Sequence, residues 1–439
     1  MTTIFAQSSA YGKSGITVYR ISGNKALELL KMLTKKDSFE PRKAYYTKIF
    51  YPLSDKIIDQ GIVIYFQQQN SFTGEEVVEL YLHGSIAISK IITEALSKIE
   101  FLRLADPGEF SKRAFLNGKI DLTSAEGIAD LIDAETAMQH SQAIGQMSGR
   151  LGAIYENWRA GLLKIMAYLE AFIDFPDEEI PLSLLGEIDI ELERLKSELR
   201  NHLNDNKRGE KLRNGINLAI FGPPNVGKSS LMNYLAARDV AIVSEIAGTT
   251  RDAIETFIDL EGYPICIVDT AGIRQATKDL IEQEGIKRAI EKAGQADIKI
   301  LLLSPEVDIN KLDSDIKQIL DDQTIIVVNK TDLLDHIPKD NSIYISLKTS
   351  FNLQGLMQKI KLTAASVAGK GENPSITRAR YRQNIELALQ NLENFNLSKD
   401  LVLSVEDIRQ AVRHLSFITG KISVDEILGE IFSSFCIGK

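Results

Sequence analysis

One short stretch has residue types and spacing suited to phosphate chemistry. It runs from Gly222 to Ser229 in the order Gly-Pro-Pro-Asn-Val-Gly-Lys-Ser and fits the phosphate-loop pattern G-x-x-x-x-G-K-[ST]. Glycines let backbone N–H groups surround phosphate oxygens, while Lys228 would reach the β- and γ-phosphates and Ser229 would bind Mg²⁺. The stretch predicts a nucleotide site, but taken alone it does not distinguish ATP from GTP.

Two later motifs predict the base of that nucleotide. An apolar run, Ile325–Val328, ends in Asn329-Lys330-Thr-Asp332. A carboxylate at Asp332 pairs with the N1–H and the exocyclic amine of guanine, whereas adenine offers no matching donors. Ser346–Lys348 ends a further predicted strand, where a loop would cover the guanine O6. The base is therefore predicted to be guanine.

Two segments between these motifs have the residues of nucleotide-sensing switches. Thr250 follows the flexible Ile246–Gly248 segment and could cap Mg²⁺ and the γ-phosphate. An apolar strand ends in Asp269-Thr-Ala-Gly272, which would place Asp269 behind the Mg²⁺ and the Gly272 amide near the γ-phosphate. The motifs occur in order, each at the carboxyl end of a strand, where open α/β sheets bind ligands. The sequence thus predicts a P-loop, Ras-like GTPase domain.

The composition limits the other possibilities. With 439 residues, 44% of them hydrophobic and 25% charged, the chain is expected to be a soluble globular protein of two to four domains. A net charge of −9 argues against non-specific nucleic-acid binding through overall charge. Cys266 and Cys436 are too few for a disulfide framework or a zinc site. Without a signal peptide, transit peptide or long apolar run, the protein is expected in the cytoplasm, with no membrane attachment.

The segments around these motifs are predicted to be of two kinds, mixed α/β and wholly helical. Residues 1–118 are predicted to be mixed α/β, with strands over Ile16–Ile21, Ile58–Phe66 and Val77–Leu82 and helices over Lys25–Leu33 and Ile86–Ile99. Residues 119–214 are predicted to be helical, over Thr123–Gly149, Tyr155–Phe172 and Leu184–Leu203.

The nucleotide domain, 215–368, separates this helical segment from a second one, 369–439. Neither helical piece has a partner layer of its own, and a piece of about 65 residues is too short for a comfortable isolated core. We therefore expect a multidomain α/β plus α fold, in which one helical domain is formed from two chain segments and the P-loop domain is inserted into it.

The whole chain resembles the MnmE (TrmE) family, bacterial GTPases of tRNA wobble-uridine modification. The stretches that carry the resemblance are Tyr19–Gly23, Ser71–Glu76, His83-Gly84, Pro107–Gly118, Phe175–Glu179, Ile246–Asp252 and the terminal Phe435-Cys-Ile-Gly-Lys439. The resemblance implies that 1–118 is a folate-binding and homodimerisation domain. It implies a heterotetramer with the FAD-dependent MnmG (GidA) subunit, the flavin coming only from that partner. Together they would add a carboxymethylaminomethyl or aminomethyl group at C5 of the wobble uridine of certain tRNAs.

The resemblance also changes how three charged residues are interpreted. Taken alone, Arg20, Glu79 and Lys119 interrupt apolar patterns and are more often solvated or paired charges. In the family, the matching positions bind 5-formyl- or methylene-tetrahydrofolate, with the terminal Lys439 as a further contact. Cys436 is interpreted as structural or close to the folate, not as a nucleophile.

The hydrolytic machinery lacks one expected residue. Ras-like enzymes orient the attacking water with a Gln directly after Asp-x-x-Gly, but Ile273 occupies that place, followed by Arg274. The family resemblance implies that K⁺ compensates, bound when two nucleotide domains meet. The positions that match the K⁺ site are Asn225, Ser244, Ile246 and Thr249.

The resemblance further implies a catalytic glutamate in the second switch. Alignment on Gly285–Arg288 selects Glu282, with Glu284 as the alternative. Glu282, Lys228 and Thr250 are the predicted catalytic residues, and Ser229 and Thr250 the predicted Mg²⁺ ligands. The predicted GTP-binding residues are Asn225, Val226, Gly227, Lys228, Ser229, Ser230, Ser244, Glu245, Ile246, Ala247, Gly248, Thr249, Thr250, Asp269, Thr270, Ala271, Gly272, Asn329, Lys330, Asp332, Ser346, Leu347 and Lys348.

Two other classes of GTPase fit the sequence less well. A ribosome-assembly GTPase would need a basic RNA-binding appendix such as a KH or OB module, which the sequence does not contain. A dynamin-like membrane GTPase would need an amphipathic basic or apolar paddle, which is also missing. The sequence does not indicate which tRNAs are modified, or whether glycine or ammonium donates the nitrogen.

Overall fold

The structure, a computed structural model, describes most of the chain. The described residues are 2–174, 182–238, 255–268, 293–309, 312, 314–321, 323–369, 374–396, 401–422 and 425–438. The chain divides into two compact units, Met1–Ala129 with Ser416–Lys439, and Asp130–Leu415. The first unit includes the last four residues of α14 (Leu401–Thr419) and the whole of α15 (Asp425–Ser433), although both helices follow the nucleotide segment in sequence. The last 24 residues thus belong to the same unit as the N-terminal domain.

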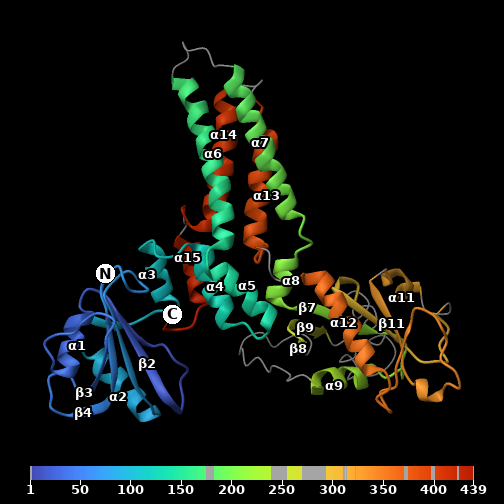
Figure 1. The fold of residues 1–439 in the computed structure, drawn as a ribbon, viewed down its shortest axis with the longest axis horizontal. Helices are drawn as coiled ribbons and strands as arrows, with labels where there is room; N and C mark the ends of the chain where they lie inside the picture. Colours follow the sequence, from blue (N-terminus) through green and yellow to red (C-terminus); the bar gives the residue numbers. More distant parts are fainter. Residues whose placement is uncertain are drawn as a thin grey trace, which may run out of the picture. The chain divides into compact units, whose positions relative to one another are not determined.

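The first unit is built on a six-stranded sheet in the order β3-β4-β5-β2-β1-β6 (Figure 1). Neighbouring strands are antiparallel, except that β6 runs parallel to β1. The strands are β1 Thr3–Gln7, β2 Ser14–Ser22, β3 Ala44–Phe50, β4 Ile57–Phe66, β5 Val77–Gly84 and β6 Leu102–Leu104. The predicted strands within β2, β4 and β5 are confirmed.

Alternation along the strands directs one face of this sheet into a large apolar core. Tyr19 and Leu80 point into a core that includes Leu29 and Leu33 of α1 (Ala26–Thr34) and residues of α2 (Ile86–Ser97). Complete burial of each such leucine contributes roughly 1.5–3 kcal/mol. Since side chains alternate between faces, Arg20 and Glu79 lie on the opposite face of the sheet.

The C-terminal segment completes this unit. Phe432 and Phe435 form a cluster with Leu122 and, beside them, Phe115, which lies in α3 (Glu109–Leu116). Beyond them, the Ser8 hydroxyl donates to the carbonyl oxygen of Gly438 at 3.0 Å. The chain's end is therefore held against the end of β1.

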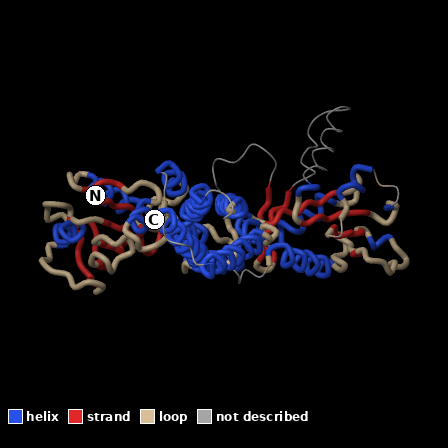
Figure 2. Tube along the Cα trace, turned by 90° about the horizontal axis from the view of Figure 1, so that it is seen from above, coloured by secondary structure: helices blue, strands red, loops and turns tan. Residues whose placement is uncertain are grey.

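The second unit contains a second six-stranded sheet, in the order β12-β11-β10-β7-β9-β8 (the red strands at the right of Figure 2). All its neighbours are parallel except the β8–β9 hairpin. The strands are β7 Ile216–Phe221, β8 Glu255–Leu260, β9 Tyr263–Val268, β10 Ile298–Leu303, β11 Thr324–Val328 and β12 Ile343–Tyr344. The helices with this sheet are α9 Lys228–Arg238, α11 Ser314–Ile319 and α12 Leu353–Ala368.

The remaining helices of this unit include four long ones, which lie side by side in Figure 1. They are α6 Arg150–Asp174, α7 Leu182–Leu203, α13 Ala379–Asn394 and α14. Tyr155 of α6 packs edge-on against Tyr381 of α13, with ring centroids 6.0 Å apart. Helices from before and after the nucleotide segment therefore share one core.

One predicted helix is wrong in its extent. The sequence over Thr123–Gly149 suggested continuous helical structure, but the chain forms α4 (Leu122–Ile132) and α5 (Ala137–Met147) with a break between them. Thr136 caps α5 through a capping box with Gln139, and this pair satisfies backbone donors that a continuous helix would bond itself. The T-x-x-Q spacing was a readable signal of this break.

Asp130 joins the helices on the two sides of the nucleotide segment. Its Oδ1 accepts from Arg213 Nε and from an Arg378 Nη2, each at 2.8 Å. Arg213 lies in α8 (Arg208–Asn214), directly before β7, and Arg378 lies directly before α13. The two ends of the nucleotide segment are thus tied to one carboxylate.

This carboxylate yields a stability prediction. Asp130→Ala should lower the free energy of unfolding by roughly 1–3 kcal/mol, because two partly buried guanidinium groups lose a charged acceptor. Urea unfolding followed by far-UV circular dichroism measures the effect. The control is Glu170→Ala, which breaks an exposed ion pair with Arg409 and should cost about 0–1 kcal/mol. An equal loss in both variants would contradict the assignment.

Candidate functional site

The predicted phosphate loop connects β7 to α9 and requires glycine at two positions. Gly222 has φ 142°, and a Cβ there would lie 2.1 Å from the carbonyl oxygen of Leu302 in β10. Gly227 has φ 105°, and a Cβ there would lie 2.5 Å from Asn329 Nδ2. Any other residue would therefore force the loop away from the strand ends. The glycines keep the loop's backbone close to the sheet, where its N–H groups can surround an anion.

The polar side chains that follow lie at the start of α9. Lys228 Nζ folds back to donate to the carbonyl oxygens of Gly222 and Pro223, at 2.8 and 2.7 Å. Ser229 and Ser230 are exposed in the first turn, and Asn225 is exposed in the loop with φ 61°. A helix N-terminus with a lysine and hydroxyl groups favours phosphate on both electrostatic and hydrogen-bonding grounds.

Asn329 connects this loop to the predicted guanine loop. Its side chain is buried, and its Nδ2 donates to the carbonyl oxygen of Val226 at 2.8 Å. Its Oδ1 accepts from the backbone N–H of Leu347 at 3.1 Å. One amide thus sets the distance between the loop that would hold the phosphates and the loop that would hold the base.

Asp332 is held by a second polar contact across the same site. The Ser346 hydroxyl donates to Asp332 Oδ1 at 2.7 Å and itself accepts from the Thr349 N–H at 3.2 Å. The hydrogen bond from Ser346 is the main cause that holds the pKa of the Asp332 carboxyl below its ordinary value. The carboxylate is therefore ionised at neutral pH, as pairing with two N–H donors requires.

This role of the Ser346 hydroxyl was not predicted from the sequence, which assigned the segment only to the cover over guanine O6. Leu347 contributes its backbone N–H to Asn329, and Lys330 (φ 63°) and Lys348 lie in the same two loops. The structure therefore brings together the predicted residues 225–230, 329, 330, 332 and 346–348 around one edge of the sheet.

The other predicted residues of this site lie outside the described part of the chain. They are Ser244, Glu245, Ile246, Ala247, Gly248, Thr249, Thr250, Asp269, Thr270, Ala271, Gly272 and Glu282. Ile273, Arg274 and Glu284 also lie outside the described part of the chain. Among the described residues, no group of three or more His, Cys, Asp or Glu side chains could hold a metal ion.

A second group of predicted residues meets on the face of the first sheet opposite the core with α1 and α2. Arg20 and Glu79 are directly opposite each other on β2 and β5. Arg20 Nε donates to Glu79 Oε1 at 3.0 Å, and Arg20 Nη2 forms an ion pair with the same oxygen at 2.9 Å. The guanidinium carbon lies 5.7 Å from the ring centroid of Phe72 and 5.8 Å from that of Phe110. The Arg20 guanidinium thus contacts two aromatic rings, of which Phe72 is partly exposed.

Lys119 lies by the loop that also contains Phe72. Its Nζ donates to the carbonyl oxygen of Gln69 at 2.6 Å, and the neighbouring Asn117 donates to the carbonyl oxygen of Thr73 at 2.7 Å. Lys119 is thus connected to the Arg20 neighbourhood through the 67–76 loop. The predicted contact at Lys439 lies outside the described residues, while Cys436, nearby in sequence, is exposed.

A buried arginine that was not predicted from the sequence holds the 67–76 loop in place. Arg113 donates to Glu75 Oε2 at 2.9 Å and to Glu109 Oε1 at 2.8 Å, and its side chain is only 4% exposed. Burial raises the pKa of Glu109, but hydrogen bonds from Arg103, Asp106 and Arg113 outweigh it and hold that pKa below the ordinary value. The two carboxylates, Glu75 and Glu109, are therefore compensated by the two guanidinium groups of Arg103 and Arg113, as burial requires. No sequence pattern identified Arg113 beforehand.

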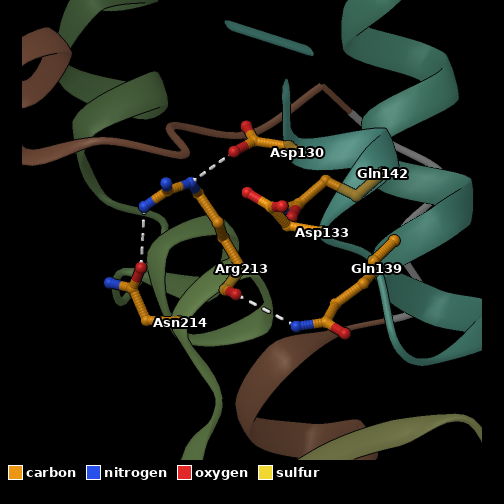
Figure 3. A pocket seen from close by; sticks show the side chains of 7 residues that line it. Asp130, Asp133, Gln139, Gln142, Arg213 and Asn214 are labelled. Atoms are coloured by element: carbon orange, nitrogen blue, oxygen red, sulfur yellow. Dashed lines mark hydrogen bonds and ion pairs between the residues drawn. The ribbon is translucent and has the colours of Figure 1, made fainter. Parts of the chain in front are cut away.

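A pocket elsewhere in the second unit contains none of the predicted site residues (Figure 3). Within it, Arg213 bonds Asp130 and Asn214, and Gln139 donates to the Arg213 carbonyl oxygen at 3.1 Å. Its lining residues are Asp130, Asp133, Ala134, Gln139, Gln142, Arg213 and Asn214. These contacts join α5 to α8, so the pocket lies at a structural junction.

None of the helices in the described residues is long and apolar enough to span a membrane.

Two known protein families match most of this chain. Residues 3–119 match the family described as the N-terminus of the GTP-binding protein TrmE, and residues 122–436 match the MnmE helical domain. The tRNA modification GTPase MnmE of Rickettsia bellii (strain RML369-C) is 52% identical over 449 residues, and that of Rickettsia rickettsii (strain Sheila Smith) is 53% identical over 445. Each alignment covers 100% of both chains.

Among solved structures, the G domain of the T. maritima FeoB iron transporter covers 34% of this chain and 98% of its own, with 26% identity. Its TM-score of 0.26 is too low to support a conclusion about fold or function.

The geometry of the base loop predicts a change of nucleotide preference. Asp332→Asn should weaken GTP binding and increase affinity for xanthosine triphosphate, because the amide N–H matches the carbonyl that replaces the guanine amine. Competition binding with both nucleotides measures this. Asp340→Asn is the matched control, since Asp340 is another exposed aspartate that accepts from a hydroxyl, that of Tyr344. Retained GTP preference in Asp332→Asn would remove this residue from the base site.

Proposed function

We propose a detailed function from one premise: this chain belongs to the MnmE family of tRNA modification GTPases. The chain is a GTP hydrolase, and we infer that it converts GTP to GDP and phosphate as part of wobble-uridine modification in the cytoplasm. The observation that carries the nucleotide assignment is the Asn329 amide, which connects Val226 of the phosphate loop to Leu347 of the guanine loop.

GTP would lie across the edge of the sheet between these loops. Asp332, held by Ser346, would accept from the guanine N1–H and amine, and the Leu347 segment would cover the O6. The ammonium of Lys228 would move from the loop carbonyls to the β- and γ-phosphates, where its charge is needed. The first turn of α9 would add its N–H groups and its dipole.

Mg²⁺ fits this donor set. The exposed Ser229 hydroxyl at the start of α9 is an oxygen ligand of the kind that Mg²⁺ prefers, and Thr250 is proposed as the second protein ligand. Mg²⁺ would neutralise charge on the β- and γ-phosphates. Asp269 and the Gly272 amide are proposed to respond to the γ-phosphate.

Water activation needs a substitute for the glutamine that Ile273 replaces. We propose K⁺, held by Asn225 with Ser244, Thr249 and the carbonyl oxygen of Ile246. The exposure of Asn225, in a left-handed conformation at the loop, supports this because an amide side chain can supply an oxygen ligand. A cation there would supply the charge that an arginine finger brings in other GTPases. Glu282 is proposed to act on the attacking water.

The modification chemistry is proposed to depend on the N-terminal domain and a partner. Arg20, Glu79, Lys119 and Lys439 would bind 5-formyl- or methylene-tetrahydrofolate as the one-carbon donor. The clustering of Arg20, Glu79 and the partly exposed Phe72 supports this, since it combines charge with an aromatic surface. The chain would act as a homodimer and as a heterotetramer with the FAD-dependent MnmG (GidA) subunit, on tRNA.

The K⁺ proposal predicts a salt-specific rate. GTP turnover should be at least about 10-fold faster in K⁺ than in Na⁺ buffer of equal ionic strength, because only the larger ion would suit the pocket and supply the missing charge. Steady-state phosphate release measures it. Glu282→Ala should lower turnover without weakening GTP binding, whereas Lys228→Ala should weaken binding as well. Equal rates in the two salts would sink the cation mechanism.

The folate proposal predicts a loss confined to one ligand. Arg20→Ala or Lys119→Ala should weaken tetrahydrofolate binding by roughly 1.5–3 kcal/mol per charged contact while GTP affinity stays unchanged. Calorimetry with each ligand separates the two. Lys98→Ala, which removes an exposed lysine paired with Glu94, is the control. Unchanged folate affinity in both variants would return these residues to a structural role.

A further inference from the structure

The Glu79 carboxylate has a second partner besides Arg20, and this partner has no assigned role. Tyr81 lies two residues further along β5, on the same face, and its hydroxyl donates to Glu79 Oε2 at 2.6 Å. Arg20 donates to the other oxygen, Oε1. The two oxygens are thus held from two sides, which sets the plane in which the carboxylate lies.

The chemistry of a carboxylate held in this way is specific. Each oxygen has two lone-pair sites, so one hydrogen bond to each leaves both able to accept again. Two parallel acceptors match a heterocycle edge with a ring N–H beside an exocyclic amine. The 2-amino-4-oxo ring of a pteridine has this edge, as guanine does. Glu79 can therefore pair with a pteridine only if its plane is turned toward the ligand.

Tyr81 keeps its proton under all physiological conditions. Burial, followed by the hydrogen bond to Glu79, raises the pKa of Tyr81 to about 12. The phenol thus acts only as a donor to the carboxylate near neutral pH. The phenol therefore supplies a hydrogen bond to Glu79 and adds no positive charge beside it.

We propose that Tyr81 is the positioning residue that orients Glu79 toward the 2-amino-4-oxo edge of the folate's pteridine. This inference rests on the proposed folate function and names the group of the ligand that the site selects. Tyr81 acts through Glu79 and is not itself a catalytic residue.

The same domain offers a matched pair for comparison. Tyr65 on β4 donates to Glu76 Oε1 at 2.9 Å, and burial and this bond raise the pKa of Tyr65 to about 12 as well. Tyr65 belongs to the apolar core on the other face of the sheet. Tyr65→Phe therefore removes the same kind of bond in the same sheet, but away from Arg20 and Glu79.

The experiment measures binding of tetrahydrofolate and of its 2-desamino-2-methyl analogue to the full-length protein by calorimetry. Tyr81→Phe keeps the ring and removes only the hydroxyl, so the fold should be retained. We expect Tyr81→Phe to weaken tetrahydrofolate binding about 10-fold, as for a lost bond to a charged group, and to leave binding of the analogue nearly unchanged. The preference of the wild type for the amino ligand should therefore shrink by about the same factor. Tyr65→Phe should keep that preference.

Each alternative outcome has a definite meaning. A wild type that binds no tetrahydrofolate overturns the proposed folate function and this inference with it. If the wild type binds and Tyr81→Phe keeps the full preference for the amino ligand, only the role of Tyr81 is overturned. Equal weakening of both ligands also overturns it, because a general structural effect would not discriminate the 2-amino group.

Discussion

One carboxylate connects the two ends of the nucleotide segment, and the packing of the helices around that segment depends on this connection. Asp130 accepts from Arg213, just before β7, and from Arg378, just before α13. Arg382 strengthens the same closure by donating to Asp205 at 2.6 Å and to Glu210 at 3.0 Å. These contacts hold the two ends of the nucleotide segment close together. A complete α/β sheet can therefore be inserted between two helical segments without separating their helices.

The two candidate sites use the same physical device in different folds. In each, an acidic side chain is held by a hydroxyl, Asp332 by Ser346 and Glu79 by Tyr81. A hydroxyl can orient a carboxylate without neutralising its charge, so the acid remains a strong acceptor for N–H groups. Guanine and the pteridine of a folate present the same kind of edge. The recurrence of a hydroxyl-held carboxylate fits our proposal that the protein binds both kinds of ring.

Much of the nucleotide site could be predicted because its motifs are local. The positive φ angles at Gly222 and Gly227, and the close approach of each to a neighbouring strand or side chain, leave little choice of residue, so the pattern is visible in the chain. The break at Thr136 was also local, but helical periodicity on both sides concealed it. The residues of the two switch segments stay predictions.

By itself, the sequence determined the nucleotide motifs and the apolar strands that lead into them. It also determined the strands within β2, β4 and β5 and the mixed α/β or helical character of each segment. Tertiary structure decided which polar groups meet. Arg20 bonds Glu79, Arg113 bonds Glu75, and Ser8 bonds the Gly438 carbonyl oxygen, across separations of 59, 38 and 430 residues. Such pairs depend on strand register and on how distant segments pack, and neither is written in the spacing of neighbouring residues.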